Sequence, residues 1–138
     1  MLFPFSRLGD NELVARFVIS KRWIRSSNQS VKPDAFMPPP NKEFSVTRHK
    51  GISTEKLWRH GKAVAEKRTA TEKRDVRLLG RADVSVSDVR KQNIEAVPRP
   101  IWGNWNHAHL IGWPTNKDHQ KMIAMEIAAE AKYVAIDR

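Results

Sequence analysis

The chain contains no cysteine among its 138 residues. Disulfides, thiolate metal sites and thiol nucleophiles are therefore excluded, and the composition fits a reducing cytoplasm. The chain also lacks any run of about 18 uncharged apolar residues, the length that a membrane-spanning helix needs. Its opening apolar stretch, MLFPF, is short and is soon followed by Arg7, which is not the pattern of a secretory signal. We expect a cytoplasmic protein with no membrane partner.

Signatures of nucleotide and ester chemistry are missing as well. The chain has no GxxxxGK[ST], GxGxxG, HExxH or GxSxG motif. Nucleotide hydrolysis, dinucleotide redox chemistry and serine hydrolysis therefore have no support. We expect no cofactor and no bound metal.

Acidic residues are scarce relative to basic ones. The chain has 25 Lys and Arg against 15 Asp and Glu, a net charge of +10 and a pI of about 10.3. Residues 1–50 carry nine basic and four acidic side chains, residues 51–100 carry twelve and seven, and residues 101–138 carry four of each. A positive field of this kind attracts polyanions, of which nucleic acid is the commonest in a cell. The alternative partner is an acidic protein, within a larger complex.

Periodicity and capping residues predict the secondary structure. Apolar residues at the spacing of one helical face predict a helix over 11–19, with Asp10 as its cap. Capping residues Ser53, Ser85 and Thr115 predict three more helices, over 54–68, 86–92 and 116–133. The first of these carries Leu57, Val64, Trp58 and Ala65 on its inner face and is weakened by Gly61. Alternation and apolar runs predict strands over 43–49, 77–84, 94–98 and 107–113.

These elements predict a single α+β domain over residues 1–138. We expect a small mixed or mostly antiparallel sheet of three or four short strands, with helices packed on one face. Four prolines between residues 31 and 42 predict an extended segment there, with Phe36 and Met37 turned inward. Residues 1–9 and 134–138 are expected to be flexible tails.

The stretch NWNHAHLIGWP, residues 104–114, holds the residues best suited to acid–base chemistry. On a strand, His107 and His109 point to the same side. Two such imidazoles could share a metal, but a third ligand at a recognisable spacing is missing. They could instead cleave RNA without a metal, with Arg48, His49 or Arg81 holding the phosphate. The alternative is structural, with both histidines at the end of a half-buried strand, bonded to backbone or to neighbouring asparagines.

Three segments are candidates for binding nucleic acid, because exposed aromatic rings stack on bases while cations hold phosphates. They are KRWIR at 21–25, the basic stretch from residue 50 to 81, and the loop IWGNWN at 101–106. The alternative for KRWIR is that Trp23 packs into the core and the cations are simply solvated, and for the basic stretch that it is an ordinary charged helix surface. For the loop, the alternative is that Trp102 packs into the core and Trp105 shields the sheet edge. The predicted contact residues are Lys21, Arg22, Trp23, Arg25, Arg59, Lys62, Lys67, Arg68, Arg81, Trp102 and Trp105.

The sequence therefore favours a small basic cytoplasmic protein that binds DNA or RNA. An accessory role in a bacterial or phage defence system, or in a mobile element, is one setting for such a protein. The first alternative is a metal-independent ribonuclease or related phosphodiesterase, of the toxin or effector type, that uses His107 and His109. The second is an adaptor subunit that docks on an acidic protein.

Overall fold

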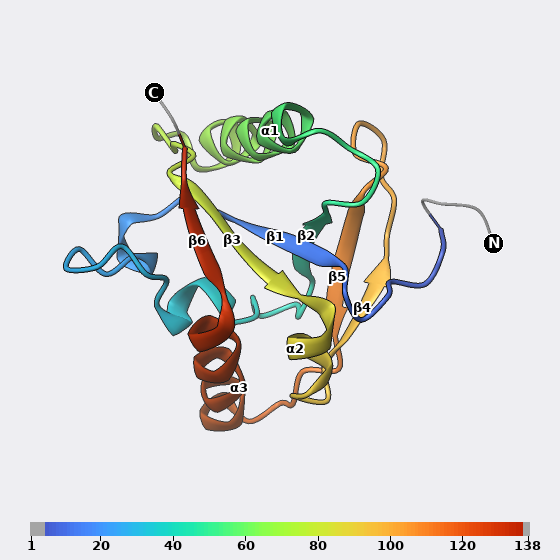
Figure 1. Ribbon diagram of the computed structural model, residues 1–138. Helices are drawn as coiled ribbons and strands as arrows, with labels where there is room; N and C mark the ends of the chain where they lie inside the picture. The colour runs from blue at the N-terminus through green and yellow to red at the C-terminus, as the bar shows by residue number, and fades with distance from the viewer. Residues whose placement is uncertain (1–4, 137–138) are drawn as a thin grey trace.

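The computed structural model describes residues 5–136, and a six-stranded antiparallel sheet forms its centre (Figure 1). The strands lie side by side in the order β4-β5-β2-β1-β3-β6. They are β1 (Leu13–Val18), β2 (Phe44–Arg48), β3 (Gly80–Ser85), β4 (Glu95–Pro98), β5 (His107–Ile111) and β6 (Lys132–Ala135). The helices within these residues are α1 (Thr54–Glu72), α2 (Val86–Arg90), α3 (Lys117–Glu130) and the 3₁₀ helices η1 (Lys21–Trp23) and η2 (Pro33–Phe36). The α+β class is confirmed, but the expected three or four strands are six.

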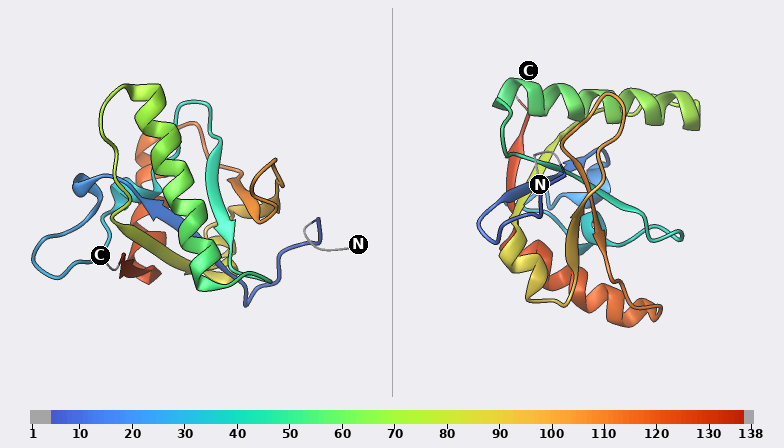
Figure 2. Two further views of the ribbon diagram at one scale, coloured as in Figure 1. Left: turned by 90° about the horizontal axis from the view of Figure 1, so that it is seen from above. Right: turned by 90° about the vertical axis from the view of Figure 1, so that its right-hand side faces the viewer.

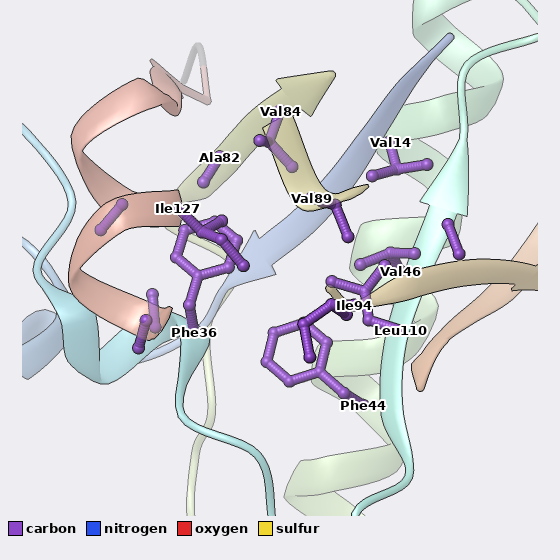
Figure 3. Packing of buried hydrophobic residues seen from close by; sticks show 14 of the residues in the cluster. Val14, Phe36, Phe44, Val46, Ala82, Val84, Val89, Ile94, Leu110 and Ile127 are labelled. Carbon is purple, nitrogen blue, oxygen red and sulfur yellow. The ribbon is translucent and has the colours of Figure 1, made fainter. Parts of the chain in front are cut away.

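Helices cover both faces of the sheet rather than the single face that we expected (Figures 1 and 2). The larger core lies between the sheet and α3, and it includes Val14, Val84 and Ile127 (Figure 3). The smaller core lies under α1 and includes Phe17 and Leu57. The central strands send apolar side chains to both sides, so each face needs its own cover.

The first regular element is the strand β1, and the predicted helix over residues 11–19 is wrong. Val14 and Val18 point into the larger core, whereas Phe17 points into the smaller one. β1 lies between β2 and β3, so both of its faces are buried. A strand buried on both faces loses the apolar–polar alternation that identifies strands in a sequence, and its apolar run then imitates a helix.

Helix α1 begins where the sequence predicts. Ser53 Oγ accepts a hydrogen bond from the backbone N–H of Lys56 at 3.1 Å, which caps the first turn. The helix then continues to Glu72, past the expected end at residue 68. Among residues 5–136, no helix has both the length and the apolar character needed to cross a membrane.

The inner face of α1 differs in part from the prediction. Leu57 and Ala65 are buried as expected, but Val64 is 38% exposed. Gly61 is buried instead, and a Cβ at that position would lie 2.7 Å from Cδ1 of Phe17. The glycine that was expected only to weaken α1 therefore lets the helix approach β1 closely.

The predicted helix over residues 116–133 is shorter at both ends. Its cap is Asn116, whose Oδ1 accepts from the N–H of His119 at 2.9 Å, and not Thr115. Ala131 has an extended backbone, which ends α3 and starts the edge strand β6 beside β3. Residues 134 and 135, which we expected in a tail, therefore belong to the sheet.

The other predicted elements are present with shifted ends. Ser85 caps α2 through the N–H of Asp88, as predicted. The expected extended segment over 31–42 is interrupted by η2, although Phe36 is fully buried and Met37 packs on the larger core as expected. Leu8, in the expected N-terminal tail, is also buried, while residues 1–4 and 137–138 of the expected tails lie outside the described residues.

Candidate functional site

The face of the sheet that carries α1 becomes polar toward β2 and β5. Thr47 pairs with His107 and Ser45 pairs with His109 across these two strands. Thr47 also pairs with Ala15 of β1, which lies in the core under α1. All four polar side chains are therefore on the α1 side of the sheet, since side chains paired across strands share a face. This confirms that His107 and His109 point the same way.

His107 and His109 form a close pair of neutral imidazoles. Their ring centroids are 5.0 Å apart, and both side chains are partly exposed. The Nδ1 atom of His107 lies 2.8 Å from the carbonyl oxygen of Arg99, which can only accept, so Nδ1 carries the proton and Nε2 is a free base. Burial lowers the pKa of both rings, and the positive charge of Lys67 lowers that of His107 further. Both rings are therefore uncharged at neutral pH.

Two buried asparagines anchor the loop that precedes these histidines. Asn104 Nδ2 donates to Thr47 Oγ1 at 3.1 Å. Asn106 Nδ2 donates to the carbonyl oxygens of Arg48 and Lys50 at 2.8 and 2.7 Å. The loop is thus fixed to the end of β2 and to the turn that leads into α1. The structural alternative for the histidines allowed bonds to the backbone or to these asparagines. The structure shows a backbone bond for His107, to the carbonyl oxygen of Arg99, and gives the asparagines this anchoring role.

The anchored loop presents two tryptophans to solvent. We call residues 101–105 the hairpin tip. Trp102 is 91% exposed and Trp105 is 50% exposed, and their rings meet edge to face with centroids 6.0 Å apart. The hairpin of β4 and β5 extends beyond the sheet on the α1 side, so its tip stands at the level of that helix (Figures 1 and 2). Neither ring packs into the two cores.

Helix α1 carries a row of basic side chains on one flank. Lys56, His60 and Lys67 recur on the side that faces His107, as the effect of Lys67 on the His107 pKa indicates. Burial, Lys56 and Arg59 lower the pKa of His60, so the charge of Arg59 also acts on this ring. We call Lys56, Arg59, His60 and Lys67 the basic flank. Its three cations are exposed and form no ion pair with any residue in 5–136.

A second cluster lies on the same face under the first turns of α1. His49 Nε2 lies 2.9 Å from Oδ1 of the buried Asp83, and Arg81 Nε lies 3.1 Å from both oxygens of that carboxylate. The Arg81 guanidinium stacks on Trp58, 4.6 Å from its centroid. Arg81 is therefore engaged within the fold. The Asp83 carboxylate accepts from His49 Nε2 and thereby fixes the orientation of this ring.

Several other predicted contact residues lie elsewhere. Arg48 is fully buried in an ion pair with Glu12. Lys62 is on the opposite flank of α1, where it lines a shallow hollow with Asp75. Arg68 is paired with Glu72 at 3.1 Å.

The segment KRWIR lies at the far end of the strands from the hairpin tip, because it follows β1 whereas the tip adjoins the end of β2. Trp23 in this segment is partly buried against the larger core. Lys21, Arg22 and Arg25 are exposed. The structure thus brings Lys67 close to His107 and places Trp102 and Trp105 on the loop that leads into the histidine strand, and it leaves KRWIR apart.

Sequence reasoning missed two functional candidates. It did not pair His49 with Asp83, which lies 34 positions away, and no local spacing signals that contact. It also did not single out Arg16, because an arginine in a predicted helix is usually solvated, whereas Arg16 lies on β1. Within residues 5–136, no three His, Cys, Asp or Glu side chains gather in a way that could hold a metal ion.

Comparisons with protein-family models, curated proteins and solved structures found no match for this chain. The site must therefore be interpreted from its own geometry and charge.

Proposed function

We propose that the protein binds single-stranded nucleic acid in the cytoplasm on the α1 side of its sheet. In this proposal the hairpin tip stacks on bases, while the basic flank of α1 and Arg99 hold phosphates. The observation that carries it is the exposure of Trp102, 91%, on a loop fixed by two buried asparagines beside unpaired cations. Stacking needs an open base face, which a single strand offers and a duplex does not.

The exposed tryptophans of the hairpin tip support this proposal, because apolar rings left in water do not stabilise the fold. A large apolar ring at the tip of a loop gains nothing from the folded state, because it is not buried there. The paired rings of Trp102 and Trp105 instead form an exposed aromatic surface. Unpaired Lys56, Arg59 and Lys67 beside it supply the sequence-independent electrostatic part of nucleic-acid affinity.

Substitution of Trp102 tests the stacking directly. Trp102→Ala should weaken binding to a labelled single strand roughly 5- to 150-fold, the equivalent of about 1–3 kcal/mol per stacked base. Fluorescence anisotropy gives the affinity, and thermal unfolding should be unchanged because the ring packs in neither core. Met122→Ala is the matched control, since Met122 is 65% exposed on α3 across the sheet. Equal affinities for wild type and Trp102→Ala would contradict the proposal.

Substitution of the lysines tests the charge. Lys56→Gln with Lys67→Gln should weaken binding and reduce the slope of log affinity against log salt by about 2, if each lysine meets one phosphate. The control pair is Lys117→Gln with Lys121→Gln, which removes the same charge from α3. If both pairs lower affinity equally, the attraction depends only on net charge and the surface is not the one proposed.

Metal-independent cleavage of RNA is a second candidate, favoured by the two neutral imidazoles 5.0 Å apart beside Lys67. One ring could take the 2′-OH proton while the other or the lysine stabilises the phosphate. A denaturing gel of RNA incubated in EDTA would then show cleavage that is lost in His107→Ala or His109→Ala. Intact RNA strands would rule out cleavage and leave binding as the proposed function. Absence of binding together with a stoichiometric acidic protein in the purified sample would favour the adaptor function.

A further inference from the structure

Strands β1 and β2 pair over only part of their length. Val14 pairs with Arg48 and Ala15 pairs with Thr47, and the pairing stops there although both strands continue. Figure 3 shows the two ribbons spreading apart, with the ring of Phe44 between them. We call this opening in the sheet the β1–β2 fork.

Arg16 occupies the fork. Its Nε donates to the carbonyl oxygen of Ala35 at 3.0 Å, and its Nη1 donates to that of Ser45 at 3.1 Å. The guanidinium lies 4.1 Å from the ring centroid of Phe44 and 5.2 Å from that of Trp23. Two aromatic rings and two carbonyls therefore hold the group at a fixed position and orientation.

The charge of Arg16 has no compensating carboxylate among residues 5–136. Burial, together with repulsion from Arg68 of α1, lowers the pKa of Arg16 to about 10. A guanidinium that is largely withdrawn from water without a counter-charge opposes folding. An apolar side chain would fill the fork without this loss of hydration free energy. We therefore expect the cation to have a partner outside the chain.

The guanidinium has donors available for that partner. A guanidinium carries five N–H groups, and the two carbonyls use two of them. The side-chain atoms of residues 5–136 that are sealed from solvent without a hydrogen-bond partner are Ser6 Oγ and Arg81 Nη1. Nη2 of Arg16 has no described acceptor and is not among them, so it is open to solvent. The rings of Phe44 and Trp23 lie against the guanidinium, which leaves the edge with Nη2 for a ligand, and guanidinium groups bind oxyanions at their edges.

We propose that Arg16 in the β1–β2 fork binds a phosphate group. A phosphate is favoured over a carboxylate because the charge of Arg16 is uncompensated among residues 5–136, and the attraction to a cation is stronger for a dianion than for a monoanion. The fork lies toward the end of β1 and away from the hairpin tip. The proposal therefore goes beyond nucleic-acid binding and does not depend on it.

Titration of the whole protein with inorganic phosphate tests this site. Wild type should bind phosphate saturably at one site per chain by calorimetry, and its thermal midpoint should rise with phosphate at constant ionic strength. Acetate should bind at least tenfold more weakly. Comparison with adenosine monophosphate separates free phosphate from a nucleotide as the source: equal affinities assign the site to the phosphate group alone, and tighter binding assigns it to a nucleotide.

Arg16→Lys keeps the charge but removes the planar set of guanidinium N–H donors. It should weaken phosphate binding roughly 10- to 150-fold, the equivalent of a charged hydrogen bond. Arg25→Lys is the matched control, because Arg25 also donates to a backbone carbonyl but is exposed. If Arg16→Lys does not fold, the Nε–H resonance of Arg16 in the wild-type spectrum should still shift with phosphate. No saturable binding, equal binding of acetate, unchanged affinity in Arg16→Lys, or an unmoved Arg16 resonance would overturn the proposal.

Discussion

Replacement of Glu12 by glutamine should destabilise the fold because it removes a carboxylate that neutralises the buried charge of Arg48. Arg48 is completely buried, and its Nε and Nη2 donate to the two carboxylate oxygens of Glu12 at 2.8 and 2.9 Å. Nη1 of Arg48 donates to the carbonyl oxygen of Ser6 at 3.0 Å. Despite burial, which opposes it, the hydrogen bond from Arg48 lowers the pKa of Glu12. The carboxylate is therefore ionised at neutral pH.

The magnitude follows from this burial. Removing one member of a buried ion pair costs about 3–5 kcal/mol. The Glu12 side chain is 12% exposed, so water can relieve part of the loss and we expect about 3 kcal/mol. For 138 residues the entropy of unfolding is about 0.29 kcal/mol/K, so the midpoint should fall by about 10 °C. Calorimetry and urea denaturation measure both quantities.

Two controls separate the ion pair from other effects. Glu66→Gln removes an exposed carboxylate and should change stability by less than about 0.5 kcal/mol. The double variant Glu12→Leu with Arg48→Met leaves no unpaired charge and should be more stable than Arg48→Met or Glu12→Gln alone. A midpoint for Glu12→Gln within about 2 °C of wild type would refute the reasoning, since Arg48 would then not need the carboxylate.

Two further predictions concern stability. Gly61→Ala should destabilise the protein by about 1–2 kcal/mol, because overpacking against Phe17 outweighs the gain of about 1 kcal/mol in helix propensity; a higher urea midpoint would show that Phe17 can move. Stability should also decrease as the pH falls below about 6.5, because burial lowers the pKa of His107 and His109 in the folded state and the unfolded chain takes up protons first. Urea midpoints between pH 7.5 and 5.5 measure this, and the same decrease in His107→Asn with His109→Asn would assign it to other groups.

Local signals predicted the elements that depend on local chemistry. Ser53 and Ser85 cap α1 and α2 as expected, because a capping hydroxyl bonds a backbone N–H within its own turn. The alternation of Phe44 to Thr47 identified β2, since one face of that strand is apolar and the other polar. The shared face of His107 and His109 followed from the same rule.

Elements that depend on distant contacts were not predictable in this way. β1 was mistaken for a helix because its two buried faces are created by α1 and α3, which are remote in the chain. β6 was missed because its pairing with β3, and not its own residues, defines it. For the site, the bonds of Asn104 and Asn106 fix the loop that carries Trp102, and no spacing in the sequence reports those bonds.

The most direct test of the proposed function is the binding of labelled single- and double-stranded DNA and RNA by the wild-type protein across a salt series. We expect tighter binding of single strands, with log affinity falling linearly against log salt between about 50 and 200 mM. The hairpin tip predicts the preference for single strands, and the basic flank predicts the slope. Affinity that does not change with salt, or an absence of binding to any of the four polymers at about 50 mM salt, would contradict the proposal.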